Sequence, residues 1–374
     1  MMRIRLPPAF TEHARAIQAS RSAGKGKQAD AATPAVERRT VGWFRARAMH
    51  LSERLPVEPG CLAAAARGGL QDTAPRAALL ALAARAGGVG PDSWEDPEVV
   101  QIWFRQADYV VPRADVGIFT RGTMPRDPAQ AAALERVADD IHTMLDGEPQ
   151  TTRVLMPAVP ELRGDYWVRM TAATGRLHIR WDARYVHVLP VQAPDVDDEE
   201  ARLELARRHL RWHGPADERQ FARWAGVSRA DAAETWRRLV PELVPVALDG
   251  RARSLLAADE PALTGAAPPS GARFLPMGDP YLHLDAGTVV PAAPPAVAER
   301  EPEPGISRRL LNSLACRVMV DGDLVASWGR AAAKLTIAPW GPLDPATREA
   351  IDHETGTMAA ALGRALTVRW LDAA

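Results

Sequence analysis

The sequence predicts an α+β fold in which three successive modules, each made of helices followed by a β-hairpin, precede a strand-rich C-terminal region. Three observations predict it. Apolar residues recur at helical spacing in blocks that glycine or proline ends. Two β-rich runs joined by a turn follow each group of helical blocks. Beyond residue 262 the pattern changes to several short β-rich runs around a single helical block.

The composition is that of a globular protein in a reducing compartment. Hydrophobic residues make up 47% and charged residues 25% of the 374-residue chain. The chain contains no run of about 18 apolar residues, which is the length needed to span a membrane. The N-terminus lacks an apolar segment followed by a cleavage site. Cys61 and Cys316 are far apart, which excludes a thiolate metal site and favours reducing conditions. We therefore expect a cytoplasmic protein.

Charge is unevenly distributed along the chain, although the formal net charge is only −1. Residues 1–50 hold ten basic and three acidic residues, whereas residues 51–200 hold 15 basic and 23 acidic residues. Nearly all the basic residues are arginine. A protein that binds a polyanion over its whole surface would be more basic than this. If nucleic acid is the partner, the positive charge that binds it must be local.

Residues 1–39 are expected to form a basic tail without a fixed structure. Residues 20–36 are small, polar and aperiodic, which is typical of a disordered linker. Residues 1–19 are interpreted as a tail or a loosely attached helix. Ordered structure is predicted to begin near Thr40.

The first module spans residues 40–122 and has three helices before its hairpin. The opening helix carries three apolar residues at near-helical spacing: Phe44, Met49 and Leu51. A second helix runs from Cys61 to Arg67 and ends at two glycines. The third carries Pro75 in its first turn, where the missing N–H costs nothing. Residues 99–105 and 108–112 are the predicted hairpin strands.

The second module spans residues 123–196. A strongly helical segment covers residues 129–145. Residues 163–181 indicate a helix ended by Gly175 and then a strand, and residues 185–191 indicate a second strand. A second hairpin wing is therefore expected here.

The third module, residues 197–262, has the clearest pattern. An acidic run opens a helix that Gly214 ends, and residues 216–226 form a second short helix. Ser228 is a predicted N-cap for a third helix, with Asp231 at capping-box spacing. An Asp-Gly pair at 249–250 then separates two β-rich runs. Two helices about a short turn followed by a hairpin are typical of a helix-turn-helix with a wing.

The C-terminal region, residues 263–374, begins with most of a linker at 262–272. It contains a Pro/Glu-rich loop at 291–305, a hairpin turn at Asp321-Gly322 and one helix at about 345–362. Several strands that close on one another would form a small barrel. We therefore predict a β-barrel-like domain.

Four separated segments occur in the order found in a known family: FRARAMHLSERLP, GLQDTAPRAALLALAAR, RFLPMGDPYL and VMVDGDLVASW. They resemble segments of the winged-helix (helix-turn-helix) DNA glycosylases of bacteria, the AlkZ-like and YcaQ-like proteins that unhook interstrand crosslinks and excise bulky alkylpurines. The resemblance covers about residues 40–374. It implies three tandem winged helices and a C-terminal β-barrel around a DNA-binding concavity, with double-stranded DNA as partner.

The resemblance also points to a catalytic segment. The family's motif is Gln-x-Gln or Gln-x-Asp, just before a Pro-Arg-Ala-Ala helix, and the aligned residues here are Gln71, Asp72 and Thr73. The first glutamine is kept, whereas Thr73 is shorter than glutamine or aspartate and cannot ionise. The family often has Arg-Gly-Thr-x-His in its first wing, of which only Arg105 is kept.

The chemistry of base excision suggests a role for each motif residue. Hydrolysis of an N-glycosidic bond passes through an oxocarbenium-like sugar. An N7-alkylated purine is already cationic and leaves without an acid, so the enzyme must hold a water and stabilise positive charge. The carbonyl of Gln71 could accept a hydrogen bond from that water, Thr73 could hold the same water, and Asp72 could stabilise charge if its side chain points inward. The alternative is that Gln71 satisfies backbone groups between helices and that Asp72 is a helix-start anion.

Arginines on the predicted helices and wings are candidates for phosphate or groove contacts. They are Arg45, Arg47 and Arg54 in the first helix, Arg105 in the first wing, Arg229, Arg237 and Arg238 in the third module, and Arg251 and Arg253 in its wing. The alternative for each is a solvated surface. His209 and His213 are four residues apart on a helix, but no third ligand is evident, so we expect no metal and no cofactor.

Three functions remain open at this stage. The first is a DNA glycosylase that acts on alkylated or crosslinked purines, in repair or in self-protection against a genotoxic metabolite. The second is a winged-helix DNA-binding protein without catalysis, either a regulator or a damage binder. The third is a protein-interaction scaffold with no DNA affinity. For the first two we expect a monomer associated with the nucleoid.

Overall fold

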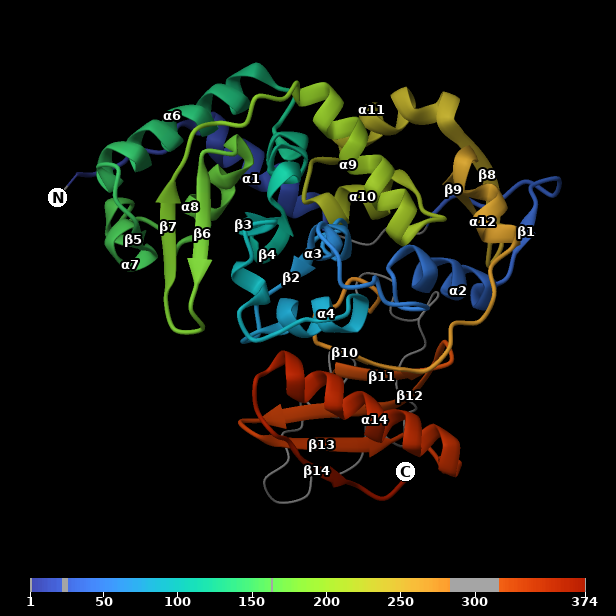
Figure 1. The fold of residues 1–374 in the computed structure, drawn as a ribbon. Coiled ribbons are helices and arrows are strands. Elements are labelled where there is room, and N and C mark those ends of the chain that lie inside the picture. Colours follow the sequence, from blue (N-terminus) through green and yellow to red (C-terminus); the bar gives the residue numbers. More distant parts are fainter. Residues whose placement is uncertain (1, 22–25, 163, 283–315, 374) are drawn as a thin grey trace. The chain divides into compact units, whose positions relative to one another are not determined.

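A computed structural model describes residues 2–21, 26–162, 164–282 and 316–373 (Figure 1). The chain forms two compact units, each built from two stretches of sequence. Unit 1 comprises Met1–Ala35 with Pro97–Glu260, and unit 2 comprises Val36–Asp96 with Pro261–Ala374. Helices and mainly antiparallel sheets occur in both, which confirms the α+β class. The helices predicted for the first module thus belong to unit 2, and its hairpin belongs to unit 1. Within the described ranges, no helix is long and apolar enough to cross a membrane.

The N-terminus differs from the expected disordered tail. Of the two interpretations given for residues 1–19, the structure contains the helix. Helix α1 (Pro8–Ser20) buries Phe10 and Ile17 in the same apolar core as α6 (Pro128–Leu145). Further along, the Ala252 N–H donates to the Lys27 carbonyl at 3.0 Å. The prediction of disorder gave too much weight to the polar segment after the helix and too little to the helical spacing of these apolar residues. Part of that segment, residues 22–25, lies outside the described residues.

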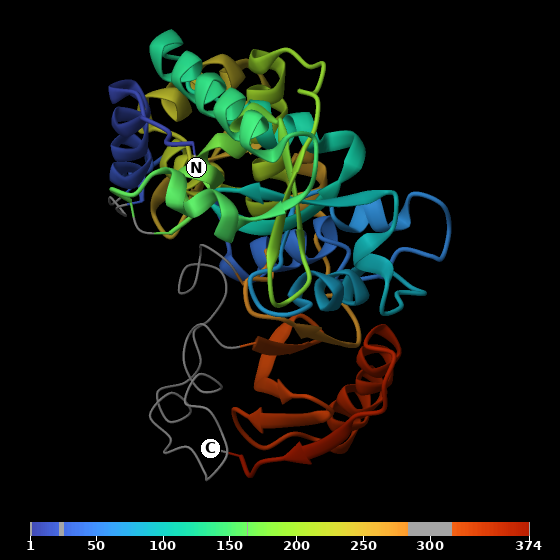
Figure 2. The same ribbon diagram turned by 90° about the vertical axis from the view of Figure 1, so that its left-hand side faces the viewer.

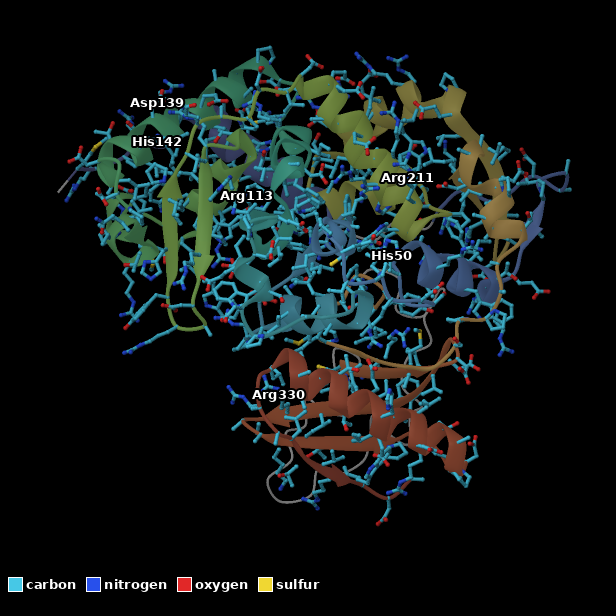
Figure 3. The ribbon with its side chains drawn as sticks, viewed as in Figure 1. His50, Arg113, Asp139, His142, Arg211 and Arg330 are labelled. Atoms are coloured by element: carbon cyan, nitrogen blue, oxygen red, sulfur yellow. The ribbon has the colours of Figure 1, made fainter. Side chains whose placement is uncertain are left out.

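Two hairpins of unit 1 lie where the sequence predicts them. Strands β3 (Val99–Phe104) and β4 (Ala107–Pro112) pair antiparallel, and β6 (Leu177–Trp181) pairs likewise with β7 (Val186–Pro190). Every residue of β3 is buried. Helix α6 packs against the second hairpin. Asp139 and His142 of this helix (Figure 3) both contact Arg176, which comes just before β6: the Arg176 guanidinium donates to the Asp139 carboxylate at 2.6 Å, and the Arg176 carbonyl oxygen lies 2.9 Å from His142 Nε2. Four short elements complete this part: α5 (Val116–Thr120), β5 (Gln150–Thr151), α7 (Thr152–Leu155) and α8 (Tyr166–Thr171).

Each helix and strand predicted within residues 197–262 occurs in the structure. They are α9 (Asp198–His213), α10 (Glu218–Ala225), α11 (Arg229–Leu239), β8 (Leu243–Leu248) and β9 (Arg251–Leu256). The Asp231 N–H donates to Ser228 Oγ at 3.0 Å, which is the predicted N-cap. Asp249 and Gly250 both have positive φ, 53° and 69°, as the two central residues of a tight hairpin turn require. Two short elements lie where the chain passes from one unit to the other: β1 (Ala35–Val36) and α12 (Glu260–Thr264). Helix α12 overlaps the start of the predicted linker.

The first part of unit 2 contains the predicted helices with shifted boundaries. Its elements are α2 (Arg38–Ala48), α3 (Cys61–Ala65), β2 (Leu70–Gln71) and α4 (Ala77–Arg85). Helix α2 ends at Ala48, so Arg54 lies after the helix and not in it, and α3 ends at Ala65 rather than Arg67. Phe44, Met49 and Leu51 are buried as predicted. Helix α4, however, begins after Pro75 rather than including it, because Arg76 adopts a left-handed conformation with φ 65° that cannot continue a helix.

The second part of unit 2 is a five-stranded sheet in the order β10-β11-β12-β13-β14. Its strands are β10 (Ala272–Leu275), β11 (Cys316–Val320), β12 (Asp323–Ala331), β13 (Lys334–Pro339) and β14 (Thr367–Trp370). Neighbouring strands are antiparallel, except that β14 runs parallel to β13 after the crossover helix α14 (Pro345–Ala361). Figure 2 shows α14 along one face of this sheet, and its Ile351 and Met358 share a core with the strands.

The sheet is open rather than a closed barrel. Among the described strands, β10 and β14 are the two edges and do not pair with each other. A parallel return of the chain requires a crossover, and here the crossover helix covers the sheet face. The prediction of strands closing on one another is therefore not confirmed for the described residues. The predicted loop at 291–305 lies outside them.

Candidate active site and DNA-contacting residues

Gln71 and Thr73 form a polar pair at the end of strand β2. The Gln71 amide Nε2 donates to Thr73 Oγ1 at 2.8 Å. Gln71 is half-buried and Thr73 is exposed. A strand fixes the backbone at Gln71, and the threonine hydroxyl orients the amide, so the pair presents a defined polar group next to solvent. These are two of the three residues predicted for the catalytic segment.

Asp72, the third predicted residue, points the other way. It is fully buried, and its Oδ1 accepts a hydrogen bond from the Ala78 N–H at 3.0 Å, in the first turn of α4. The N-cap position of that helix, Arg76, provides no side-chain cap. Asp72 therefore caps α4 from outside the helix, which fits the helix-start role considered above. Its side chain points into the protein core, toward α4, and away from the exposed side on which Thr73 lies.

A loop after β10 contacts the Gln71 side chain and was not identified from the sequence. Gly278, in this loop, has φ +83°, a conformation that favours glycine. A Cβ built on Gly278 would lie 3.1 Å from Gln71 Cδ and 3.2 Å from its Oε1. The backbone of this loop therefore packs directly on the amide. The segment containing it, RFLPMGDPYL, was noted only as part of the family resemblance.

A fully buried ion pair holds this loop. Both nitrogens of the Arg85 guanidinium fork, at the end of α4, donate to the Asp279 carboxylate, each at 2.7 Å. Both side chains have no solvent exposure. Asp279 Oδ1 also accepts from the Tyr281 N–H at 2.9 Å. Two parallel charge-assisted bonds fix orientation as well as distance, so α4 and the loop form one rigid support.

His50 is a further polar residue of unit 2 that the sequence did not single out. It follows α2 with φ 57° and is half-buried (Figure 3). Burial lowers the pKa of His50, and the positive charges of Arg85 and Arg67 lower it further. The imidazole is therefore neutral at pH 7, because both a desolvated site and nearby cations disfavour its charged form.

Of the three arginines predicted to contact DNA from the first helix, only Arg47 is exposed. Arg45 was expected on the surface, but it is 2% exposed because it lies on the side of α2 that faces the core. Arg54 donates from Nε to the Ala83 carbonyl at 2.7 Å and forms an ion pair with Glu354 of α14. Arg54 thus joins two elements of unit 2, and its charge is balanced there.

The arginines predicted in the third module differ in the same way. Arg229, Arg237 and Arg238 are exposed, and the last two both donate to Glu234, at 2.6 and 2.9 Å. These bonds lower the pKa of Glu234 to about 2.

In the wing, by contrast, both arginines are tied to neighbouring chain segments. Arg251 donates to the Gly26 carbonyl at 3.1 Å, and Arg253 donates to the Asp217 carboxylate at 2.8 Å. The exposed helix residues are therefore better placed for DNA than the wing residues.

Arg105 lies at the turn of the β3–β4 hairpin in an unusually cationic environment. Its guanidinium lies 5.7 Å from the centre of the Tyr109 ring, and its Nη1 is buried without a hydrogen-bond acceptor among the described residues. Burial lowers the pKa of Arg105, and the charges of Arg21 and Arg223 lower it further. The positive charges of Arg21 and Arg223 thus act on Arg105, and an anion bound near it would offset their repulsion. Arg21 and Arg223 were not identified from the sequence, because they come from different helices.

The histidine pair and most tryptophans are core residues. His209 and His213 are buried against Trp224, with ring centres 5.0 and 5.6 Å apart. No group of three metal-ligating side chains occurs in the described parts of the chain. Six tryptophans are likewise buried: Trp94, Trp103, Trp167, Trp212, Trp224 and Trp236.

Comparison with known proteins adds to this geometry. The family model for AlkZ-like DNA glycosylases matches residues 64–361. Among solved structures, the chain is similar to the Streptomyces sahachiroi DNA glycosylase AlkZ, with a TM-score of 0.65 and 18% sequence identity over 90% of this chain and 100% of that chain. At this identity the structural likeness shows a shared fold. No curated protein matches the sequence.

Proposed function

Because this chain belongs to the AlkZ-like DNA glycosylase family, we propose that it hydrolyses the N-glycosidic bond of alkylated or crosslinked purines in DNA. The observation that supports this most directly is the Gln71–Thr73 pair. The glutamine at the family's first motif position is half-exposed, and its amide is oriented by the threonine at the second. The biological setting we propose is repair or self-protection against a genotoxic metabolite, by a monomer that works on the nucleoid.

In the proposed mechanism, Gln71 positions the attacking water. Its carbonyl oxygen accepts a hydrogen bond from the water and holds it near the anomeric carbon, while the cationic purine leaves without protonation. Thr73 fixes the amide through the 2.8 Å bond and can also hold the water through its hydroxyl oxygen. Asp72 acts indirectly, because its carboxylate is engaged with α4. The neutral amide attracts the oxocarbenium-like sugar less strongly than a carboxylate would.

The proposed DNA contacts come from the exposed or unbalanced arginines. Arg47 in unit 2 and Arg229, Arg237 and Arg238 in unit 1 are exposed, and Arg105 lies among cations. We propose that these residues neutralise backbone phosphates. Phosphate contacts of this kind set the position of the protein on DNA without specifying sequence. Arg45, Arg54, Arg251 and Arg253 have structural roles in the free protein, and their contact with DNA is correspondingly less favoured.

The finer architecture is also proposed. We propose that the helices and hairpins at residues 40–122, 123–196 and 197–262 form three tandem winged helices, and the order of helices α9 to α11 followed by the β8–β9 hairpin supports the third. We propose that the open sheet of strands β10 to β14 corresponds to the family's C-terminal domain.

The experiment that tests the function uses a duplex with one N7-alkylguanine. The duplex is incubated with protein and treated with alkali, which breaks the strand wherever a base has been excised. We expect strand breaks with the wild-type chain and at least a roughly tenfold lower rate with Gln71→Ala, on the scale of single-group deletions. Binding of the duplex should change little. Clean binding without strand breaks on N7-alkylated or crosslinked substrates would reject the glycosylase proposal.

Thr73 favours one alternative, a DNA-binding protein without catalysis. Thr73 stands at the second polar position of the motif, where other members of the family have the amide of glutamine or the carboxylate of aspartate. The variant Thr73→Gln separates the two functions in the same assay. A gain in excision rate would mean that the shorter side chain limits an existing activity. A footprint at one preferred sequence, with no preference for a lesion and no excision by either form, would favour the alternative.

A further inference from the structure

We propose that the loop Pro276–Tyr281 is a positioning element for the Gln71 amide, with Gly278 as the residue that sets the amide's orientation. This inference rests on the proposed role of Gln71. It assigns to the C-terminal part of the chain a function in catalysis that is separate from DNA binding.

The contact between Gly278 and Gln71 is close enough that a Cβ on Gly278 would displace the Gln71 side chain. The three nearest atoms to a Cβ on Gly278 all belong to Gln71, at 3.1 to 3.3 Å. Contacts of that length force one partner to move by a few tenths of an ångström. Gln71 has Thr73 Oγ1 on its Nε2 and the Gly278 backbone beside its Oε1. These two contacts restrain rotation of the amide, so its carbonyl keeps one direction.

The loop can transmit such a restraint because it is fixed at several points. The Asp279 N–H donates to the Pro276 carbonyl at 3.0 Å, and the Met277 N–H donates to Cys316 Sγ at 3.2 Å. The Asp279 carboxylate is held by the buried Arg85 guanidinium. The loop is thereby attached both to the β-sheet and to α4, the helix that starts just after the motif.

A restrained amide matters because the rate of water attack depends on alignment. A water held about 1 Å from its productive position can cost roughly a hundredfold in rate. A glutamine side chain has three rotatable bonds, so the contacts around it determine what fraction of the molecules hold the amide in the productive orientation. Loss of the restraint should therefore lower the rate of the chemical step and leave the affinity for DNA unchanged.

The test compares two glycine substitutions in the same unit. Gly278→Ala introduces a Cβ against Gln71. Gly271→Ala is the matched control, because its φ of +77° gives a similar backbone strain while the nearest atom to its Cβ is 3.6 Å away and belongs to Arg273. We expect Gly278→Ala to lower the single-turnover excision rate at least tenfold with a dissociation constant within about twofold of wild type. Gly271→Ala should leave both within about twofold.

A second arm separates positioning from general damage. In a Gln71→Ala background the amide is absent, so Gly278→Ala should lower the rate no further, whereas damage to the fold would multiply with the first substitution. If Gly278→Ala does not fold, Gly278→Asn takes its place, because asparagine tolerates a positive φ better than alanine and still adds a Cβ against Gln71. The same loss of rate is expected for it, and a rate equal to that of Gly271→Ala would overturn the positioning role.

The outcomes distinguish this inference from the proposed function. A rate for Gly278→Ala equal to that of Gly271→Ala, or an undiminished effect in the Gln71→Ala background, overturns the positioning role and leaves Gln71 in place. A wild-type excision rate for Gln71→Ala alone rejects the role of Gln71 itself.

Discussion

Removing one partner of the Arg85–Asp279 pair should have a large effect on stability. In Asp279→Ala the Arg85 guanidinium loses both of its 2.7 Å bonds to the carboxylate and remains fully buried. Leaving one member of a buried pair without its counter-ion costs about 3–5 kcal/mol. The Tyr281 N–H also loses its acceptor, which adds about 1 kcal/mol. We expect unit 2 to lose about 4–6 kcal/mol of unfolding free energy.

The matched control is Asp323→Ala. Asp323 also pairs with an arginine of unit 2, Arg39 at 3.2 Å, but both side chains are 63% exposed. An exposed pair contributes less than about 1 kcal/mol. The assay is urea unfolding followed by circular dichroism and tryptophan fluorescence, with both variants compared with wild type.

Two results bear on the reasoning. A double substitution, Arg85→Met with Asp279→Leu, should recover most of the lost stability, because it removes both charges and fills the space with apolar groups. Equal midpoints for Asp279→Ala and Asp323→Ala would refute the argument that burial makes this pair important.

Two further predictions concern unit 1. Arg105→Gln should weaken duplex binding about equally for all sequences and reduce the slope of log affinity against log salt by about one, as measured by fluorescence anisotropy at several salt concentrations. The control is Arg136→Gln, which replaces an exposed arginine of α6. Equal slopes for the two variants would reject the proposed phosphate contact. Burial and the nearby Arg113 lower the pKa of His178 to about 4. Since the unfolded-state pKa is about 6.5, unfolding free energy should fall as pH drops from 6.5 to 4, and His178→Gln should flatten that fall in thermal unfolding curves. An identical pH dependence in the variant would contradict this.

Local sequence signals were sufficient for most elements. Ser228 and the pair Asp249-Gly250 specify a cap and a turn through bonds and φ values within a few residues, so the third module could be predicted closely. The motif residues Gln71 and Thr73 were also identified, through the family resemblance. Their direct bond spans only two residues and is a local consequence of the strand end.

Contacts between segments that are distant in sequence could not be predicted from local patterns. The burial of Arg45 and the pairing of Arg54 with Glu354 depend on which side of α2 and its following loop meets the rest of unit 2. The open sheet depends on where the crossover helix places β14. An arginine-rich sequence does not show which guanidinium groups already have a carboxylate partner.

The sequence by itself determined the order of helices and hairpins and the caps and turns, and through the family resemblance it pointed to Gln71 as the proposed catalytic amide. These follow from periodicity and from bonds between near neighbours. Only the tertiary structure decided that Asp72 faces α4, that Gly278 lies against Gln71, and that Arg85 and Asp279 bond across 194 positions of sequence. The physical reason is that burial and ion pairing depend on distances in space, and folding brings together groups that no local pattern relates.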